Sequence, residues 1–209
     1  MSTIKVNNIQ DVKTLTIGDA TAEDTKIVFD GNAQDFHIGL DDSADSLTIG
    51  LGSTLGTTSH MVFDANGIIT KPLQPAFSVT KSGHQSDLSS GLTTITFDTE
   101  RFDQNGDFAS NTFTAPVTGR YQLSFNLYLD GITQASAYYQ ANLATSNRKY
   151  YFVFDPDFGQ NNVFWNLNGS LLVEMDAGDT ATIEMDLGSG VDGTNDINAV
   201  SSFHGFLAC

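Results

Sequence analysis

Two pairs of carboxylates near the C-terminal end of the chain have a spacing that suits metal binding. Glu174 and Asp176 alternate with apolar residues in one expected strand, and Glu184 and Asp186 do the same in the next. If the two strands form a hairpin through the turn at Gly178, all four carboxylates crowd one surface patch. Oxygen ligands of this kind suit calcium, which would be the only cofactor, whereas a solvated acidic face is the ordinary alternative.

Paired carboxylates can also cleave glycosidic bonds, provided that they face a groove lined by aromatic side chains. An enzyme that degrades surface polysaccharide is therefore one hypothesis. The chain has no Gly-X-Ser-X-Gly elbow, and its four histidines lie far apart without the spacing of zinc ligands. The sequence thus favours a non-enzymatic protein. The aromatic residues that a hydrolytic groove would use are Tyr138, Tyr139, Tyr150, Tyr151 and Trp165.

A polar loop with one aromatic residue is the first candidate for a binding contact. Asp155 and Asp157 are separated by a proline, and Phe158 follows them directly. A phenyl ring beside carboxylates suits contact with a sugar or a protein, because recognition residues concentrate in loops on a rigid scaffold. The alternative is a turn whose Phe158 packs into the core. The other binding candidates are Tyr138, Tyr139 and the loops 130–136, 145–148, 155–161 and 188–196.

The chain is strongly acidic, with 25 Asp and Glu residues against 9 Lys and Arg residues and a formal net charge of −16. Such a chain repels nucleic acid and anionic lipid, so we expect neither as a partner. Because no apolar run is long enough to span a bilayer or to form a secretion signal, we expect a soluble chain without membrane insertion. The single cysteine, Cys209, excludes an internal disulfide.

Residues 121–129 carry the clearest signal for the fold class. Apolar or aromatic side chains occupy every odd position, which is the period of a strand with one face in a core. Pro116 and Gly119 place a turn just before this strand. No window has the apolar spacing of a helix, so the sequence predicts an all-β protein. The strands expected after residue 75 span 76–80, 92–98, 112–117, 120–129, 137–144, 149–154, 162–167, 170–176, 180–187 and 198–207.

Residues 113–125 read Phe-Thr-Ala-Pro-Val-Thr-Gly-Arg-Tyr-Gln-Leu-Ser-Phe. This stretch resembles the central signature of the complement 1q-type globular head, and the resemblance covers residues 76–209. It implies a C-terminal jelly-roll β-sandwich of the kind that tumour necrosis factor shares. A homotrimer would explain why residues 150–154 are aromatic on both faces, since a neighbouring subunit would cover one of them. A carbohydrate-binding aromatic surface is the alternative.

The first third of the chain repeats one small unit. Leu15-Thr16-Ile17-Gly18 returns at residues 36–39 and 47–50, with turn residues between the copies. Short strands of this kind form a β-helix, hairpins or a meander, and three copies wound around one axis would bury their apolar side chains. We expect two N-terminal attachment strands, at residues 3–9 and 13–17 of the segment 1–20, a repetitive β shaft in 21–72 and the jelly-roll head in 73–209.

The N-terminal segment also resembles shaft segments of tail-fibre-like proteins of marine bacteriophages, in its start at residues 1–9 and its exit at 64–72. There is no collagen repeat ahead of the head. Together the resemblances imply a non-enzymatic, trimeric fibre or appendage of a virion, on tail or capsid, made in the host cytoplasm. Its N-terminus would bind other virion proteins and its head a host-surface glycan or protein. A secreted bacterial complement-like adhesin and a polysaccharide-degrading fibre enzyme are the alternatives.

Overall fold

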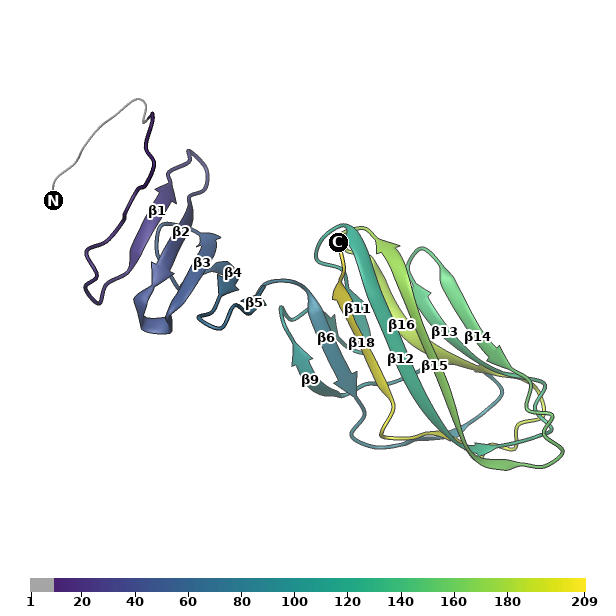
Figure 1. Cartoon of the computed structure of the whole chain (residues 1–209). Coiled ribbons are helices and arrows are strands. Elements are labelled where there is room, and N and C mark those ends of the chain that lie inside the picture. Colours follow the sequence, from purple (N-terminus) through teal and green to yellow (C-terminus); the bar gives the residue numbers. More distant parts are fainter. Residues whose placement is uncertain (1–9) are drawn as a thin grey trace. The chain divides into compact units, whose positions relative to one another are not determined.

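The structure is a computed structural model that describes residues 10–209 (Figure 1). It separates into two compact units, which divide between Leu73 and Gln74. Both units consist of strands, and the 3-10 turn Asp42–Ala44 is the one helical element among the described residues. This composition confirms the predicted all-β class. Within residues 10–209 no helix has the length and apolar character needed to cross a bilayer.

The N-terminal unit is one five-stranded antiparallel sheet in which each strand pairs with the next along the chain. The near repeats of the sequence form its centre, where Ile38 of the second strand lies opposite Ile49 of the third. Of the three arrangements expected for this segment, the structure has the meander. Its strands are β1 (Thr25–Phe29), β2 (Phe36–Asp41), β3 (Ser46–Leu51), β4 (Ser59–Phe63) and β5 (Ile69–Thr70).

The two strands expected ahead of this sheet have different outcomes. The one expected at residues 3–9 lies outside the described residues. The one expected at residues 13–17 is wrong, because this stretch pairs with no strand among the described residues and leaves Leu15 and Ile17 exposed. Gly18 adopts a positive φ, and the Thr21 amide donates to Asp19 Oδ1 over 3.1 Å. This local turn bends the chain before the stretch meets a partner strand.

One face of the N-terminal sheet is covered by the chain itself. The loop after β3 crosses Gly39 and Gly50: a Cβ at Gly39 would lie 3.0 Å from Leu55 Cδ1, and one at Gly50 would lie 2.8 Å from the His37 ring. His37 is fully buried there, with its Nδ1 2.9 Å from the carbonyl oxygen of Gly52. The glycines of the repeat are therefore needed for the close approach of this loop.

The C-terminal unit, the head, is a sandwich of two antiparallel sheets with a jelly-roll topology, as predicted (Figure 1). The β16 sheet has the order β10-β11-β16-β13-β14, with β8 beside β16, and the β12 sheet has the order β7-β17-β12-β18-β6-β9, with β15 also paired to β12. The strands are β6 (Ala76–Thr80), β7 (Gln85–Leu88), β8 (Gly91–Thr94), β9 (Thr99–Asp103), β10 (Phe108–Ala109), β11 (Thr112–Thr114), β12 (Gly119–Ile132), β13 (Tyr139–Thr145), β14 (Lys149–Phe154), β15 (Asn162–Met175), β16 (Thr180–Leu187), β17 (Asn195–Ile197) and β18 (Ser202–Leu207).

The core of the head follows the alternation seen in the sequence. Every odd position of β12 from Tyr121 to Leu129 is buried between the sheets. Phe77 of β6 stacks on Phe113 with ring centroids 4.6 Å apart and meets the edge of Phe203 at 5.0 Å. Because the side-chain period of a strand is two, one buried residue fixes the inward face of the whole strand.

Two strands expected at 162–167 and 170–176 are one continuous strand, β15, in the structure. The expected break at Asn168-Gly169 does not occur, because β12 pairs with β15 along its full length. Gly169 has a packing role instead: a Cβ there would lie 2.5 Å from the Phe152 ring and 2.6 Å from the Phe125 ring. A glycine lets the two rings meet over the strand. The strand expected at 198–207 begins later, at Ser202.

One carboxylate in the head opposes folding at neutral pH. Asp107 Oδ2 is buried and has no hydrogen-bond partner among the described residues. Burial first, and then the charge of Asp103, raise the pKa of Asp107 above its ordinary value. A carboxyl whose pKa is raised by folding destabilises the fold above that raised pKa, and the penalty disappears below the pKa of the unfolded chain.

We therefore expect Asp107→Asn to raise the thermal midpoint at about pH 7 and the gain to shrink to nothing below about pH 4. Thermal unfolding of both proteins followed by circular dichroism across this range measures the effect. A difference that stays constant with pH would contradict it.

Candidate functional site

The four carboxylates proposed as a calcium site do not form one patch. β15 pairs with β12 and β16 pairs with β13, so Glu174 and Asp176 belong to one sheet and Glu184 and Asp186 to the other. The predicted hairpin is wrong because the Gly178 turn carries the chain across the sandwich from one sheet to the other. The calcium hypothesis loses the geometry on which it depended. In residues 10–209 no group of three or more His, Cys, Asp or Glu side chains is arranged to hold a metal ion.

The second pair of carboxylates has partners of its own. Glu184 Oε2 lies 2.8 Å from Lys149 Nζ and accepts a hydrogen bond from Asn142 Nδ2 over 3.2 Å. The hydrogen bond from Lys149 to Glu184 is the main reason that the pKa of Lys149 lies above its ordinary value. Asp186 lies opposite Gln140 on the outer face of the same sheet. Glu184 is therefore paired within the chain, and Asp186 lies on the same polar outer face.

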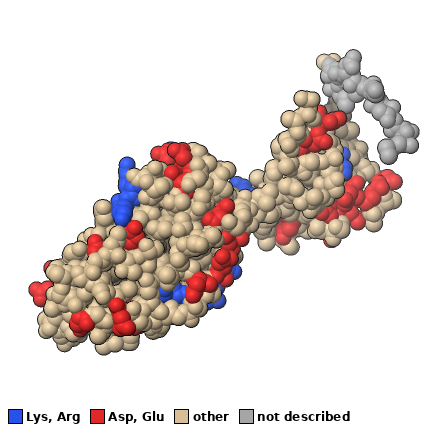
Figure 2. Space-filling model, turned by 180° about the vertical axis from the view of Figure 1, so that it is seen from behind, with Lys and Arg blue, Asp and Glu red and all other residues tan. Residues whose placement is uncertain are grey.

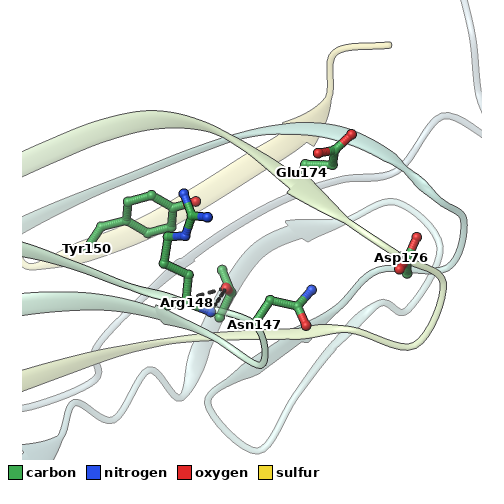
Figure 3. Close-up of a pocket in the computed structure, with 6 residues that line it drawn as sticks. Asn147, Arg148, Tyr150, Glu174 and Asp176 are labelled. Carbon is green, nitrogen blue, oxygen red and sulfur yellow. Dashed lines mark hydrogen bonds between the residues drawn. The ribbon is translucent and has the colours of Figure 1, made fainter.

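The first pair lines a polar cleft of about 280 Å³ between the β13–β14 hairpin and the end of β15 (Figure 3). Arg148 and Tyr150 project from the hairpin, with the Arg148 guanidinium carbon 6.0 Å from the centre of the Tyr150 ring. Glu174 and Asp176 come from the facing strand. The cleft is lined by Thr145, Asn147, Arg148, Tyr150, Glu174 and Asp176.

Hydrogen bonds in two turns fix the shape of this cleft. The Thr145 amide donates to the Arg148 carbonyl over 2.8 Å, and the Arg148 amide donates to Thr145 Oγ1 over 3.0 Å. Ser146 Oγ donates to Asp179 Oδ1 over 2.7 Å, which ties the hairpin to the turn after β15. This bond is the largest cause of the lowered pKa of Asp179. The hairpin and the turn after β15 are thus joined.

The arrangement in the cleft suits binding better than hydrolysis. Glu174 and Asp176 lie two residues apart on the same wall, whereas a glycoside hydrolase places its two carboxyl groups on opposite sides of the scissile bond. The opposite wall carries the Arg148 guanidinium. Among the described residues Arg148 forms no ion pair with either carboxylate. Arg148 and Glu174 therefore offer charged groups of opposite sign to a polar group from outside the chain, whereas Asp176 Oδ1 already accepts a hydrogen bond from Thr118 Oγ1 over 3.3 Å.

The loop Asp155 to Gly159 lies at the far end of the head from this cleft. There the Gln134 amide donates to Asn161 Oδ1 over 2.9 Å and the Ala137 amide donates to the Ser189 carbonyl over 2.9 Å. Three of the four expected recognition loops, 130–136, 155–161 and 188–196, therefore meet at this distal end. The loop 145–148 lies at the cleft instead.

The distal end carries a small aromatic shelf. Phe158 and Trp165 stack with ring centroids 5.0 Å apart, and Phe154 lies 5.0 Å from Trp165 beneath them. Phe158 keeps 40% of its surface exposed. Asp155 and Asp157 are exposed beside it. Phe158 is thus partly packed against Trp165 and partly exposed. This lies between the two alternatives from the sequence, an exposed contact residue and a side chain packed into the core. We call Phe158 and Trp165 the distal shelf.

The two tyrosines proposed for binding have different environments. Tyr139 as a contact residue is wrong, because its side chain is fully buried between Phe154 and the network in which its hydroxyl donates to Asn195 Oδ1 and accepts from the Thr133 amide. Its position on the inward face of β13 imposes this burial. Tyr138 directly precedes β13 and is half-buried.

One feature that sequence reasoning placed only in part is the open edge of the sandwich. β14 pairs with β13 alone and β15 with β12 alone, so each strand leaves one side unpaired. Exposed apolar side chains occupy these strands: Tyr151 and Val153 on β14, and Val163 and Phe164 on β15. Tyr151 and Val153 lie on the outer face of the β16 sheet and Phe164 on the outer face of the β12 sheet, so they flank the edge from its two sides. The run of aromatic residues in 150–154 indicated from the sequence that β14 carries an exposed apolar surface. The contribution of β15 could be identified only once the position of β15 in the sandwich was known.

A family model for the C1q domain matches residues 76–208. The chain belongs to the C1q domain family. The resemblance of residues 76–209 to the complement 1q head is thereby confirmed, whereas the resemblance of the N-terminal segment to phage fibres stays a prediction. C1q and tumour necrosis factor-like domains form homotrimers that bind receptors, and in general they are non-enzymatic.

Solved structures similar to this C1q domain include the globular domain of zebrafish complement 1qA protein, with 23% identity and a TM-score of 0.49 over 65% of this chain and 98% of that one. Murine APRIL at pH 8.0 is similar with 8% identity and a TM-score of 0.48, over 64% of this chain and 98% of that one. No curated protein matches the chain.

Proposed function

We propose that the chain is a non-enzymatic, homotrimeric fibre or appendage of a bacteriophage virion, and that its C1q domain binds a glycan or protein on the host surface. Membership of a family of binding modules supports the binding role. The viral setting rests on the likeness of the N-terminal segment to phage fibre shafts and on the β meander that stands where other family members have a collagen stalk. The N-terminus would attach to other virion proteins.

The distal shelf is the observation that supports surface recognition most directly. Sugars bind proteins through aromatic faces combined with nearby carboxylate and amide groups. Phe158 and Trp165 supply the aromatic faces, and Asp155 and Asp157 supply acceptors beside them. The cluster stands on strand ends of a rigid sandwich, so its rings are held in place before a ligand arrives.

The open edge supports the trimer. Phe164 and Tyr151 are large, exposed and apolar on strands that have an unpaired side. Exposed apolar edge strands of soluble proteins are usually covered by a partner. In a closed threefold arrangement each copy covers the β14 and β15 edge of the next.

Binding of the full-length protein to a glycan array and to host cells tests this function. We expect Phe158→Ala to weaken binding by about tenfold or more, because aromatic residues dominate such contacts. Phe102→Ala, at an exposed phenylalanine of β9, is the matched control and should leave binding unchanged. Mass spectrometry of purified virions should detect the chain.

Three outcomes would contradict the proposal. Equal binding by Phe158→Ala and wild type would remove the distal shelf from recognition. Release of reducing sugar from bound glycans would favour the polysaccharide-degrading enzyme. Detection of the chain among secreted bacterial proteins and its absence from virions would favour the complement-like adhesin.

A further inference from the structure

The N-terminal sheet has an apolar face that the chain leaves uncovered. Residues directly opposite in neighbouring strands share a face, and the register places Ile27, Ile38, Ile49 and Met61 in one row across β1, β2, β3 and β4. All four side chains are apolar, and all four retain contact with solvent. The row crosses the centre of the sheet.

The neighbouring row repeats the pattern. Leu40, Leu47, Phe63 and Ile69 lie opposite one another across β2, β3, β4 and β5. Leu47 lies on the central strand and still exposes 43% of its surface. The two rows together are called the apolar face below. A central strand of a sheet with a self-sufficient core would have these side chains buried.

The opposite face of the sheet differs from the apolar face in its cover and in its charge. It is covered by the loop that buries His37 over Gly39 and Gly50. Lys26 and Asp41, the only Lys, Arg, Asp or Glu residues in the five strands, also fall on that side of the register. The loop therefore covers this side over β2 and β3, although Val28 of β1 stays 36% exposed there. The two rows of the apolar face have no such loop over them and contain no charged residue.

We propose that three copies of this chain bring their N-terminal sheets together with the apolar face of each turned inward, which makes a shared core. This inference rests on the proposed homotrimer of the C1q domains. Only Gln74 and Pro75 separate the N-terminal unit from β6, so a trimer of heads holds three N-terminal sheets at high effective concentration.

Charge selects a second copy over another occupant. The chain carries a formal charge of −16, and on the face shown in Figure 2 both units carry clusters of Asp and Glu side chains and few Lys or Arg. Copies of so acidic a chain repel one another across most surfaces. At the apolar face two copies can meet without bringing like charges together. This face also has no carboxylate that a basic partner could bind.

The described residues ahead of β1 do not cover the apolar face in place of a second copy. Ile17 borders a shallow hollow of about 300 Å³ together with Ile27, Ile38 and Leu47, and Lys26 also contributes to its lining. Ile17 and Leu47 both remain exposed there. The hollow is thus left open by the described part of the N-terminal segment, and its largely apolar lining suits side chains from the facing sheets.

Cysteine substitutions in the full-length Cys209→Ser protein test the inference. Leu47→Cys and Leu40→Cys place thiols on the apolar face, and Lys26→Cys places one on the charged face as the matched control. The measurements are mass by light scattering, the rate of maleimide labelling and cross-linking between chains by a short bismaleimide, with circular dichroism to confirm folding.

We expect a mass of three chains, labelling of Leu47→Cys and Leu40→Cys at least about tenfold slower than that of Lys26→Cys, and cross-links between chains for the first two alone. A three-chain mass with equally fast labelling, or with slow labelling and no cross-links, would overturn the inference and leave the trimeric head intact. A one-chain mass would overturn the trimeric head itself, and the shared core with it.

Discussion

Phe164→Asp should dissociate the trimer into single chains. Phe164 exposes 58% of its surface in the isolated chain and packs against Tyr128 with ring centroids 5.6 Å apart. Both residues lie on the outer face of the β12 sheet, and Phe164 belongs to β15, the strand at the open edge. Burial of an unpaired carboxylate at an apolar contact costs roughly 3–5 kcal/mol. Each trimer has three equivalent interfaces, so the substitution makes the free energy of association less favourable at all three. Association should therefore be lost at micromolar concentration.

Light scattering of the full-length protein measures this effect directly. The expected mass falls from three times 22.5 kDa to the mass of one chain. Leu92→Asp is the matched control: Leu92 is 53% exposed on β8, on the outer face of the other sheet, and it should leave the mass unchanged. A trimeric Phe164→Asp protein, or a monomeric Leu92→Asp protein, would show that the open edge is not the contact.

Phe77→Ala should destabilise the head by about 3–5 kcal/mol, since truncation of a buried phenylalanine leaves a cavity in a close-packed core. Phe77 is almost fully buried, and its ring contacts those of Phe108, Phe113 and Phe203. These three partners come from β10, β11 and β18. The loss therefore affects contacts between the two sheets as well as within one.

Denaturant unfolding followed by Trp165 fluorescence, at one fixed protein concentration because association shifts the midpoint, measures this loss. Phe102→Ala removes the same side chain from an exposed position one strand away and should cost no more than about 0.5 kcal/mol. Similar losses for the two variants would mean that the ring cluster does not form the core of the head.

The inward faces of the strands could be read from the sequence. Alternation in residues 121–129 predicted which side chains of β12 are buried. The alternation seen around Glu184 and Asp186 likewise matches the buried Ala181, Ile183 and Met185 of β16. The signature at residues 113–125 led to the jelly roll and to the C1q family. These features are local, because the alternation of side chains depends on the strand alone.

The partners of the strands could not be read in this way. Glu174 and Asp176 looked adjacent to Glu184 and Asp186, yet the chain crosses between sheets at the intervening turn. The burial of Tyr139 depends on Asn195 and Phe154, which other strands deliver. The distal shelf combines Phe158 of a loop with Trp165 of β15 in the same way.

The sequence by itself therefore determined the all-β class, the family of the head and the buried side of each long strand. The tertiary structure decided which sites these strands build: the cleft between β14 and β15, the distal shelf, the open edge and the apolar face of the N-terminal sheet. The physical reason is that alternation fixes the face of a strand at a period of two, whereas the choice of its neighbour depends on long-range hydrogen bonding and packing that no single stretch encodes.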